Sequence, residues 1–333
     1  MTPGPCDSSG RFYRDQMTRV EIKKAAFPIG SGDLLYFGGS CFAENLHSYW
    51  QDHFLPCGLA PFGSTYNPAS LRDSFRLICS ESAVKEEELF LHNELWRHPL
   101  FNTLIVDKDA TVLTRRINAE LKAHRVLLKK TDHLVLTLGT AFVFEEKATQ
   151  KIVNNCHKRP ASEFQRYSLT SEEITKALKD LMKAVRGINP QVRLILTLSP
   201  VRHLRDKAWE NSLSKALLRC GLDEYLKHDI ESQYFPSFEI MMDELRDYRW
   251  YADDLVHPSE TALGYIMEQF REFYGDKDLN IYLQEAETLA AMHRHRILHP
   301  DTAEGRKFNQ NKESKTQEFI KRYPFCIRDN LLR

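Results

Sequence analysis

The sequence predicts an α/β protein built on a parallel β-sheet with helices on both faces. Three apolar runs have the length and composition of buried strands, at residues 34–37, 134–138 and 192–198. The stretches between them carry apolar residues at helical spacing. Strands that alternate with helices in this way typically form a parallel sheet that is covered on both faces.

The first strand and helix meet at a pair of glycines near the N-terminus. The apolar run 34–37 ends at Gly38 and Gly39. Residues 40–54 then carry aromatic and aliphatic side chains three to four positions apart, which is the spacing of one helix face. We therefore expect a buried strand that passes through a tight turn directly into a helix, with Ser40 at the junction.

The middle of the chain repeats this pattern. The run 134–138 ends at Gly139, as a strand before a turn does. Thr170 and Glu173 have the spacing of a capping box, which predicts a helix that starts there and stops near Gly187. The third strand follows this helix, so the order of strand, helix and strand is preserved.

Three regions are expected along the chain. Residues 1–17 are rich in proline, glycine and serine and are predicted to be a flexible leader. Residues 18–278 are predicted to form the α/β domain, with two further helices over 208–219 and from Pro258 to about residue 274. Residues 279–333 are predicted to be a helical, polar C-terminal extension.

The charge balance excludes two classes of function. The 333 residues hold 46 Lys and Arg against 46 Asp and Glu, a net charge of +0. A general nucleic-acid binder or a polybasic membrane-surface protein needs an excess of basic residues. No run approaches the roughly 20 apolar residues of a membrane helix, no apolar signal segment is visible, and the seven cysteines include no CxxC pair. We therefore expect a cytoplasmic protein without a nucleic-acid, membrane or obligate protein partner.

Ser40 is the first candidate for chemistry. In a parallel sheet the working residues gather beyond the carboxyl ends of the strands, and Ser40 follows the first strand. The start of a helix offers backbone N–H groups and the positive end of the helix dipole, which favour a developing oxyanion. The pattern is compatible with a nucleophile and also with a serine that only caps the helix.

Asp254 and His257 form the second candidate. They lie three residues apart, directly before the helix that begins near Pro258. One turn of chain can bring the carboxylate to the imidazole, where it would fix the tautomer and stabilise the imidazolium. With Ser40 they supply a nucleophile, an orienting acid and a base in the chain order Ser, Asp, His. The alternative is a turn-capping aspartate beside an ordinary histidine.

A sequence signature adds to this interpretation. Residues 39–43 spell Gly-Ser-Cys-Phe-Ala, and the chain resembles the GSCFA family over about residues 18–300. Other segments that carry the likeness are 61–68, 137–141, 155–158, 199–203, 243–249 and 254–258. The resemblance implies a branch of the SGNH hydrolases with a flavodoxin-like three-layer sheet. It also implies Ser40 as nucleophile, His257 as general base and Asp254 as its orienting partner, but no substrate.

One motif of the SGNH hydrolases is missing. These enzymes usually place Gly-x-Asn-Asp after a central strand, and the asparagine donates to the oxyanion. This chain has Gly139-Thr140-Ala141-Phe142 at that point, and the Gly-x-Ser-x-Gly elbow of α/β-hydrolases is not matched either. The remaining candidates for oxyanion or substrate contacts lie near the expected strand ends: Gly39, Cys41, Asn67, Thr140 and Asn155.

Three basic or imidazole side chains complete the candidate site. Arg202 follows the third strand and presents a rigid fork of donors that suits an anionic or polar substrate group. His203 lies beside it, and the alternative for both residues is a brace for the Ser40 turn. His157 could contact the substrate or support residues that do. The spacings match no familiar zinc site, so no metal and no cofactor are expected.

These residues together predict an SGNH-like serine hydrolase, an esterase or O-deacylase that works through an acyl-enzyme on Ser40. The expected substrate is a small ester or an acylated carbohydrate. Two alternatives stay open. The same three residues could pass the acyl group to a hydroxyl acceptor, which makes the protein an acyltransferase. The missing asparagine instead favours a non-catalytic binding module on a degenerate hydrolase fold. A Cys41 nucleophile is a minor alternative, because it needs a lowered thiol pKa.

Overall fold

The computed structural model describes residues 18–202 and 205–328. The predicted leader at 1–17 and His203 lie outside the described residues. Within the described part, the centre of the molecule is a five-stranded sheet in the order β10–β9–β5–β1–β2. Its strands are β1 (Leu35–Gly39), β2 (Cys57–Leu59), β5 (His133–Leu138), β9 (Arg193–Leu198) and β10 (Ser232–Phe235). All neighbouring strands in this sheet run parallel.

The strand order is that of a flavodoxin-like, doubly wound sheet. Counted along the chain within this sheet, the strands lie in the order 2-1-3-4-5. The three predicted strands are β1, β5 and β9, which occupy the middle of the sheet. The two edge strands β2 and β10 were not predicted, because runs of three and four residues carry too little periodicity to be recognised.

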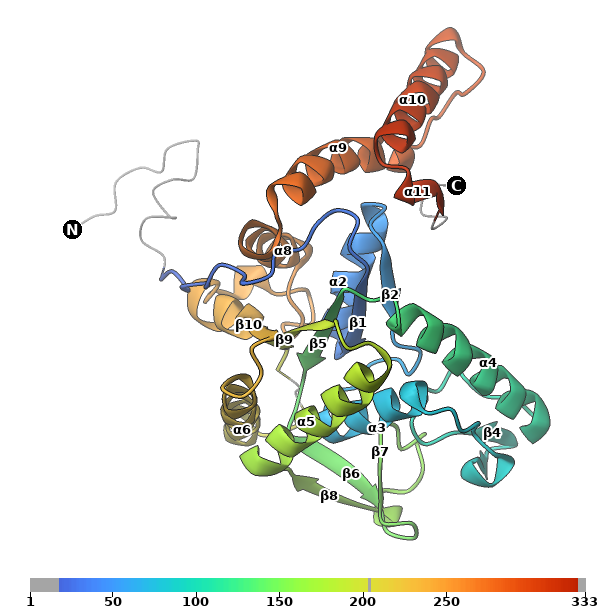
Figure 1. The fold of residues 1–333 in the computed structure, drawn as a ribbon, viewed down its shortest axis with the longest axis vertical. Helices are drawn as coiled ribbons and strands as arrows, with labels where there is room; N and C mark the ends of the chain where they lie inside the picture. The colour runs from blue at the N-terminus through green and yellow to red at the C-terminus, as the bar shows by residue number, and fades with distance from the viewer. Residues whose placement is uncertain (1–17, 203–204, 329–333) are drawn as a thin grey trace.

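Helices cover both faces of the sheet (Figure 1). Leu134 and Leu136 of β5 belong to one apolar cluster, while Val135 between them belongs to the other. The first cluster is closed by α3 (Pro68–Cys79), α4 (Ala110–Leu128), α5 (Ser171–Ile188) and α6 (Ala208–Leu226). The second is closed by α2 (Cys41–Asp52), α8 (Glu260–Tyr274) and α9 (Lys277–Arg294). The three-layer α/β prediction is therefore confirmed.

The ends of α5 follow their local sequence signals. Thr170 and Glu173 form the predicted capping box at its start. The helix ends at Ile188, one residue beyond the predicted stop near Gly187, and Asn189 is its C-cap. The Asn189 side chain also donates to the backbone oxygens of Leu128 and Thr131, which ties this end of the helix to the end of α4 and the loop before β5.

Two antiparallel excursions extend the chain around the large sheet. The strands β6 (Phe142–Glu146), β7 (Lys151–Val153) and β8 (Phe164–Ser168) form a small sheet in the order β7–β6–β8 directly after β5, at the bottom of Figure 1. The strands β3 (Phe90–His92) and β4 (Leu95–Arg97) form a hairpin between α3 and α4. Short helical segments are η1 (Glu86–Glu88), η2 (Ala161–Glu163), α7 (Ser237–Glu239), the π-helical η3 (Ile240–Glu244) and η4 (Tyr248–Trp250).

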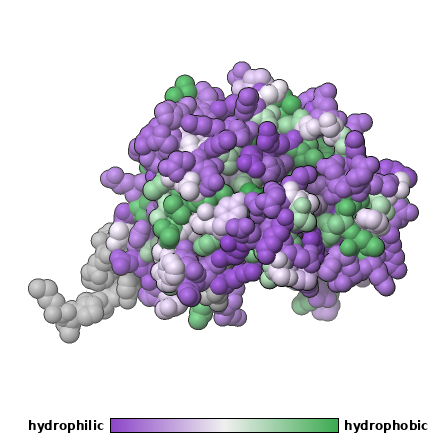
Figure 2. Space-filling view, turned by 90° about the horizontal axis from the view of Figure 1, so that it is seen from below, coloured by the Kyte–Doolittle hydropathy of each residue, from purple (hydrophilic) through white to green (hydrophobic). Residues whose placement is uncertain are grey.

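The C-terminal helices are partly continuous with the core. The predicted boundary after residue 278 falls in the first turn of α9, whose Tyr282 is buried and donates to the backbone oxygen of Phe54. Helices α10 (Ala303–Arg322) and α11 (Phe325–Arg328) follow, and α10 projects away from the sheet (Figure 1). In the ranges 18–202 and 205–328, no helix has the length and apolar character needed to cross a membrane. The face in Figure 2 is mainly hydrophilic, with hydrophobic residues in separate small groups.

Candidate active site

A glycine at a backbone conformation that other residues rarely adopt places Ser40 at the carboxyl edge of the sheet. Gly39 ends β1 with φ +128°, a conformation that side-chain-bearing residues rarely adopt. A Cβ atom on Gly39 would lie 2.1 Å from the carbonyl oxygen of Thr137 on the neighbouring strand. The Ser40 N–H donates to the same oxygen at 3.0 Å, and the Thr65 N–H donates to the Gly39 oxygen at 2.6 Å. This close approach turns the chain from β1 directly into α2.

Ser40 is the N-cap of α2. Its hydroxyl oxygen accepts a hydrogen bond from the Phe42 N–H at 3.4 Å, and the residue is completely buried. A distance of 3.4 Å marks a weak hydrogen bond. The structure therefore confirms that Ser40 caps α2. The nucleophilic role stays a prediction.

Asp254 and His257 form a tight pair on an exposed loop. The carboxylate Oδ2 lies 2.6 Å from the imidazole Nδ1, and Oδ1 accepts the N–H groups of Val256 and His257, each at 2.9 Å. The loop is closed by a hydrogen bond of 2.8 Å from the Ala252 N–H to the His257 oxygen. The His257 backbone N–H, the His257 imidazole and the Val256 N–H lower the Asp254 pKa to about 2. The carboxylate is thus ionised at neutral pH, can hold a proton on Nδ1, and leaves Nε2 for proton transfer.

The structure assembles the Asp–His pair but does not bond it to Ser40. Among the described residues, no hydrogen bond joins the Ser40 hydroxyl and the His257 imidazole, whose side chain is 48% exposed. The loop nevertheless belongs to the connection from β10 to α8, as Ser40 belongs to the connection from β1 to α2, so both follow the carboxyl ends of parallel strands. Burial raises the pKa of Tyr251 at the base of the loop, and the Arg202 guanidinium opposes this rise.

Two of the predicted oxyanion donors hold the strand-end loops in place. Asn67 caps α3: its Oδ1 accepts the Ser70 N–H at 2.7 Å and its Nδ2 donates to the Ser70 hydroxyl at 3.0 Å. The Thr140 hydroxyl lies 3.0 Å from the Ser214 hydroxyl and accepts the Phe142 N–H at 3.1 Å. Both side chains therefore have local partners in this structure.

His157 and Asn155 lie against the segment that follows β4. The Asn155 side chain accepts the His157 N–H at 2.7 Å. The His157 Nε2 donates to the His98 oxygen at 3.1 Å, and its buried Nδ1 has no partner within the described part of the chain. Burial lowers the His157 pKa to about 4, so the ring is neutral. The structure brings these residues together with His98, and no hydrogen bond links them to Ser40.

Arg202 and Cys41 lie at the strand ends with different character. Arg202 is exposed, and its guanidinium carbon lies 5.7 Å from the centre of the Phe238 ring. Cys41 is half-buried, and burial followed by the nearby Glu44 raises its thiol pKa. A raised thiol pKa disfavours the thiolate that a Cys41 nucleophile requires. In 18–202 and 205–328, no cluster of three or more His, Cys, Asp or Glu side chains could hold a metal ion.

The sequence interpretation missed Lys215, which is buried at the same edge of the sheet. Lys215 lies on α6, is 4% exposed, and donates from Nζ to the backbone oxygen of Ser199 at 2.8 Å. Burial, followed by repulsion from Arg202, lowers its pKa to about 7. The sequence held one indication of this residue. The face of α6 that is buried carries the polar residues Ser214 and Lys215, followed by the apolar Leu218. Polar residues at core positions of an amphipathic helix indicate a site.

A cavity of about 200 Å³ opens at the end of β5. Its lining combines aromatic, hydroxyl and charged side chains: Tyr66, Thr140, Phe142, Phe144, Arg166, Arg205 and Asp206. The Tyr66 backbone oxygen accepts the N–H groups of Gly139 and Thr140 at 2.7 and 3.0 Å. The cavity is therefore built on the loop between β5 and β6, and β5 is the neighbour of β1 in the sheet.

Comparisons with solved structures return matches of low similarity. A Streptococcus pneumonia protein, provisionally described as a platelet activating factor, is 12% identical with a TM-score of 0.37, covering 74% of this chain and 85% of its own. A carbohydrate esterase family 3 protein from Talaromyces cellulolyticus is 14% identical with a TM-score of 0.27, covering 47% and 60%. An acetyl xylan esterase from the rumen bacterium Butyrivibrio proteoclasticus is 12% identical with a TM-score of 0.37, covering 74% and 65%. Among curated proteins, no sequence matches the chain.

The family assignment has a direct basis in the sequence. The model of the GSCFA family matches residues 34–270. This range includes the turn that carries Ser40 and the loop that carries Asp254 and His257. It also spans the five-stranded sheet from β1 to β10. The chain belongs to the GSCFA family.

Proposed function

We propose that this protein is a serine esterase of the SGNH hydrolase type, with Ser40 as nucleophile and the Asp254–His257 pair as its base. One observation carries the proposal. A preformed Asp–His pair, with 2.6 Å between Asp254 Oδ2 and His257 Nδ1, lies on the connection from β10 to α8. Ser40 lies on the connection from β1 to α2, so both follow the carboxyl ends of strands in one parallel sheet.

The chemistry follows from these groups. The Ser40 oxygen attacks the acyl carbon of an ester while His257 Nε2 takes the hydroxyl proton. The ionised Asp254 stabilises the imidazolium through Nδ1. As the tetrahedral intermediate collapses, the alcohol leaves with the proton from His257, and the acyl group stays on Ser40. A water molecule, deprotonated by His257, then releases the acid and restores the serine.

The proposal requires Ser40 and His257 to meet when substrate binds. Two features keep the free-energy cost of this movement low. The hydrogen bond that holds the Ser40 hydroxyl is long, at 3.4 Å, and His257 lies on an exposed loop. In unliganded enzymes catalytic hydrogen bonds are often absent or long and tighten in the substrate complex.

The N-terminus of α2 is the proposed oxyanion site. Backbone N–H groups in the first turn of a helix have no intrahelical partner, and the positive end of the helix dipole favours negative charge there. The Cys41 and Phe42 N–H groups lie in that turn, and the Phe42 N–H would leave the Ser40 hydroxyl when the serine attacks. The cavity at the end of β5, with its aromatic lining, suits a small ester or an acylated carbohydrate.

One observation favours the alternative of a non-catalytic binding module. Ser40 is completely buried, and its hydroxyl serves as a helix cap in the unliganded structure. A degenerate hydrolase would keep this serine for the cap alone.

Labelling with a fluorophosphonate separates the two functions. We expect the folded, full-length protein to gain one covalent adduct, located on Ser40 by peptide mass mapping. Ser40→Ala should abolish it, and Ser82→Ala, at an exposed serine, should not. Absence of both labelling and ester hydrolysis in protein with an intact thermal transition would favour the binding module.

A further inference from the structure

Lys215 is a buried cation without a buried counter-charge. It is 4% exposed, and its ammonium group has three N–H donors. Among the described residues, the Ser199 backbone oxygen, at 2.8 Å, is its one hydrogen-bond acceptor, and no carboxylate forms an ion pair with it. Burying a charge in this way costs free energy unless a partner compensates it.

A second cation shares the surroundings of Lys215. The Lys215 Nζ lies 5.2 Å from the centre of the Phe238 ring, and the Arg202 guanidinium carbon lies 5.7 Å from the same ring. Within 18–202 and 205–328, Arg202 also forms no ion pair. Two positive groups therefore stand at one aromatic ring and repel each other, as the lowered pKa of Lys215 reflects.

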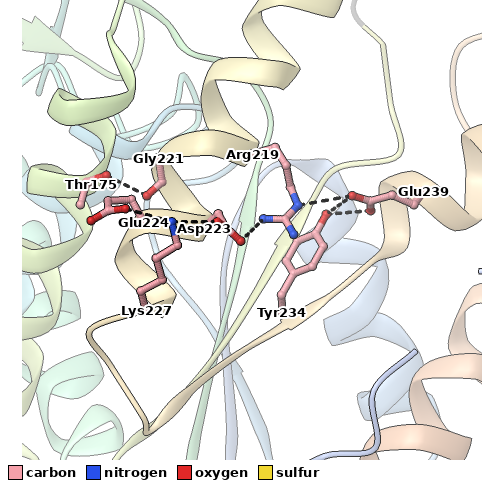
Figure 3. Close-up of polar contacts among 8 residues, drawn as sticks. All are labelled: Thr175, Arg219, Gly221, Asp223, Glu224, Lys227, Tyr234 and Glu239. Atoms are coloured by element: carbon pink, nitrogen blue, oxygen red, sulfur yellow. Dashed lines mark hydrogen bonds and ion pairs between the residues drawn. The ribbon is translucent and has the colours of Figure 1, made fainter. Parts of the chain in front are cut away.

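The carboxylate that acts on Lys215 already has other partners. Glu239 is the acid that acts on Lys215, but it accepts the Tyr234 hydroxyl at 2.8 and 2.7 Å. Arg219 lies between Glu239 and Asp223, with nitrogen-to-oxygen distances of 3.8 and 3.4 Å (Figure 3). Glu239 is thus hydrogen-bonded by Tyr234 and paired with Arg219, so it forms no ion pair with Lys215 among the described residues.

The cationic pair lies at the edge of the sheet that carries the proposed nucleophile. Ser199, which holds Lys215, directly follows β9, and Arg202 lies three residues later. Lys215 also acts on the Cys41 thiol, where it opposes the rise in pKa that burial causes. Cys41 is the neighbour of Ser40 at the start of α2. Both cations therefore lie at the edge of the sheet that carries the catalytic serine.

We propose that Lys215 and Arg202 form an anion-binding subsite next to Ser40, and that the ester processed there carries a carboxylate. This rests on the proposed function of Ser40. A single oxyanion needs few donors, whereas two cations around one ring match a permanent negative charge on the ligand. The carboxylate would accept the free N–H donors of Lys215 on one side and the fork of Arg202 on the other.

The test compares two esters that differ in charge alone. We expect kcat/KM for 3-acetoxybenzoate to exceed that for 3-acetoxybenzamide by about tenfold or more, because charge-assisted hydrogen bonds supply that discrimination. Lys215→Met keeps an unbranched side chain without the charge and should bring the ratio close to one, and Arg202→Gln should lower it in part. Lys227→Met removes an exposed lysine of the same helix region and should leave the ratio unchanged. Equal turnover of the two esters by the wild-type protein, or an undiminished ratio in Lys215→Met, overturns the proposal.

A binding measurement keeps this test separate from the fate of the hydrolase proposal. Calorimetry of the full-length Ser40→Ala protein should show binding of 3-acetoxybenzoate and much weaker binding of the amide, whether or not the wild type hydrolyses either. Binding should weaken as the pH rises through 7, because Lys215 loses its proton while the carboxylate stays ionised. The charged or titratable groups that act on Lys215 are Arg202, Cys41 and Glu239. A His257→Gln exchange in the same protein removes the imidazole of the proposed site, so that its titration does not contribute to the pH dependence. Binding that ignores ligand charge and pH overturns the subsite even if Lys215→Met fails to fold.

Discussion

The two halves of the proposed triad are built by different physics. Ser40 is set by long-range packing, because the turn at Gly39 lies against Thr137 of another strand and the whole junction is buried. Asp254 and His257 are set by local hydrogen bonds within one exposed loop. The difference indicates a rigid nucleophile and an adjustable base. Mutations in the first region should therefore change stability, and mutations in the second should change activity alone.

The largest expected effect comes from the exposed half. Asp254→Asn replaces the carboxylate that orients His257, so we expect kcat/KM for ester hydrolysis to fall by about 10³- to 10⁴-fold. The urea midpoint should barely move, because exposed ion pairs contribute little to stability. Asp253→Asn, at the neighbouring exposed aspartate, is the control and should keep full activity. A fall in stability that matches the fall in activity would show that the pair is structural.

The buried half should respond in the opposite way. Gly39→Ala places a Cβ atom 2.1 Å from the Thr137 oxygen and forces φ +128° on an alanine. We expect the free energy of unfolding to fall by about 3 kcal/mol, measured by urea denaturation. Gly32→Ala is the matched control, since nothing lies within 4 Å of its added Cβ. Equal losses for the two substitutions would contradict the view that close packing fixes the Ser40 turn.

The same division explains what the sequence could predict. The central strands β1, β5 and β9 are continuous apolar runs that end at glycine or serine, so both their existence and the position of Ser40 could be predicted. The Asp254–His257 contact could also be predicted, because a spacing of three residues suffices to form it. These features depend on local sequence or on a general rule of parallel sheets.

Features that depend on distant partners could not be predicted. The role of Thr140 was uncertain because its partner, Ser214, becomes a neighbour only when α6 packs on the sheet. Asn67 differs, because its partner Ser70 lies three residues away in a local helix cap. Lys215 was missed because burial of its helix face is decided by the fold. The burial of Ser40 likewise follows from how α2 packs on the sheet.

The smallest expected effect tests whether the buried ammonium of Lys215 lowers the stability of the folded protein. The folded-state pKa of Lys215, about 7, lies below its usual 10.5, so the unfolded chain keeps a proton between these values that the folded protein has lost. Stability therefore rises with pH in this window, by about 1.4 kcal/mol per pH unit at most. We expect urea denaturation to show that the wild-type protein gains stability relative to Lys215→Met by no more than this amount as the pH rises from 7 to 8. Below pH 7 the difference between the two should be constant, because Lys215 is protonated in both states. Lys227→Met, at an exposed lysine, should show no such gain, and a flat difference for Lys215→Met would mean that the ammonium is already compensated in the folded protein.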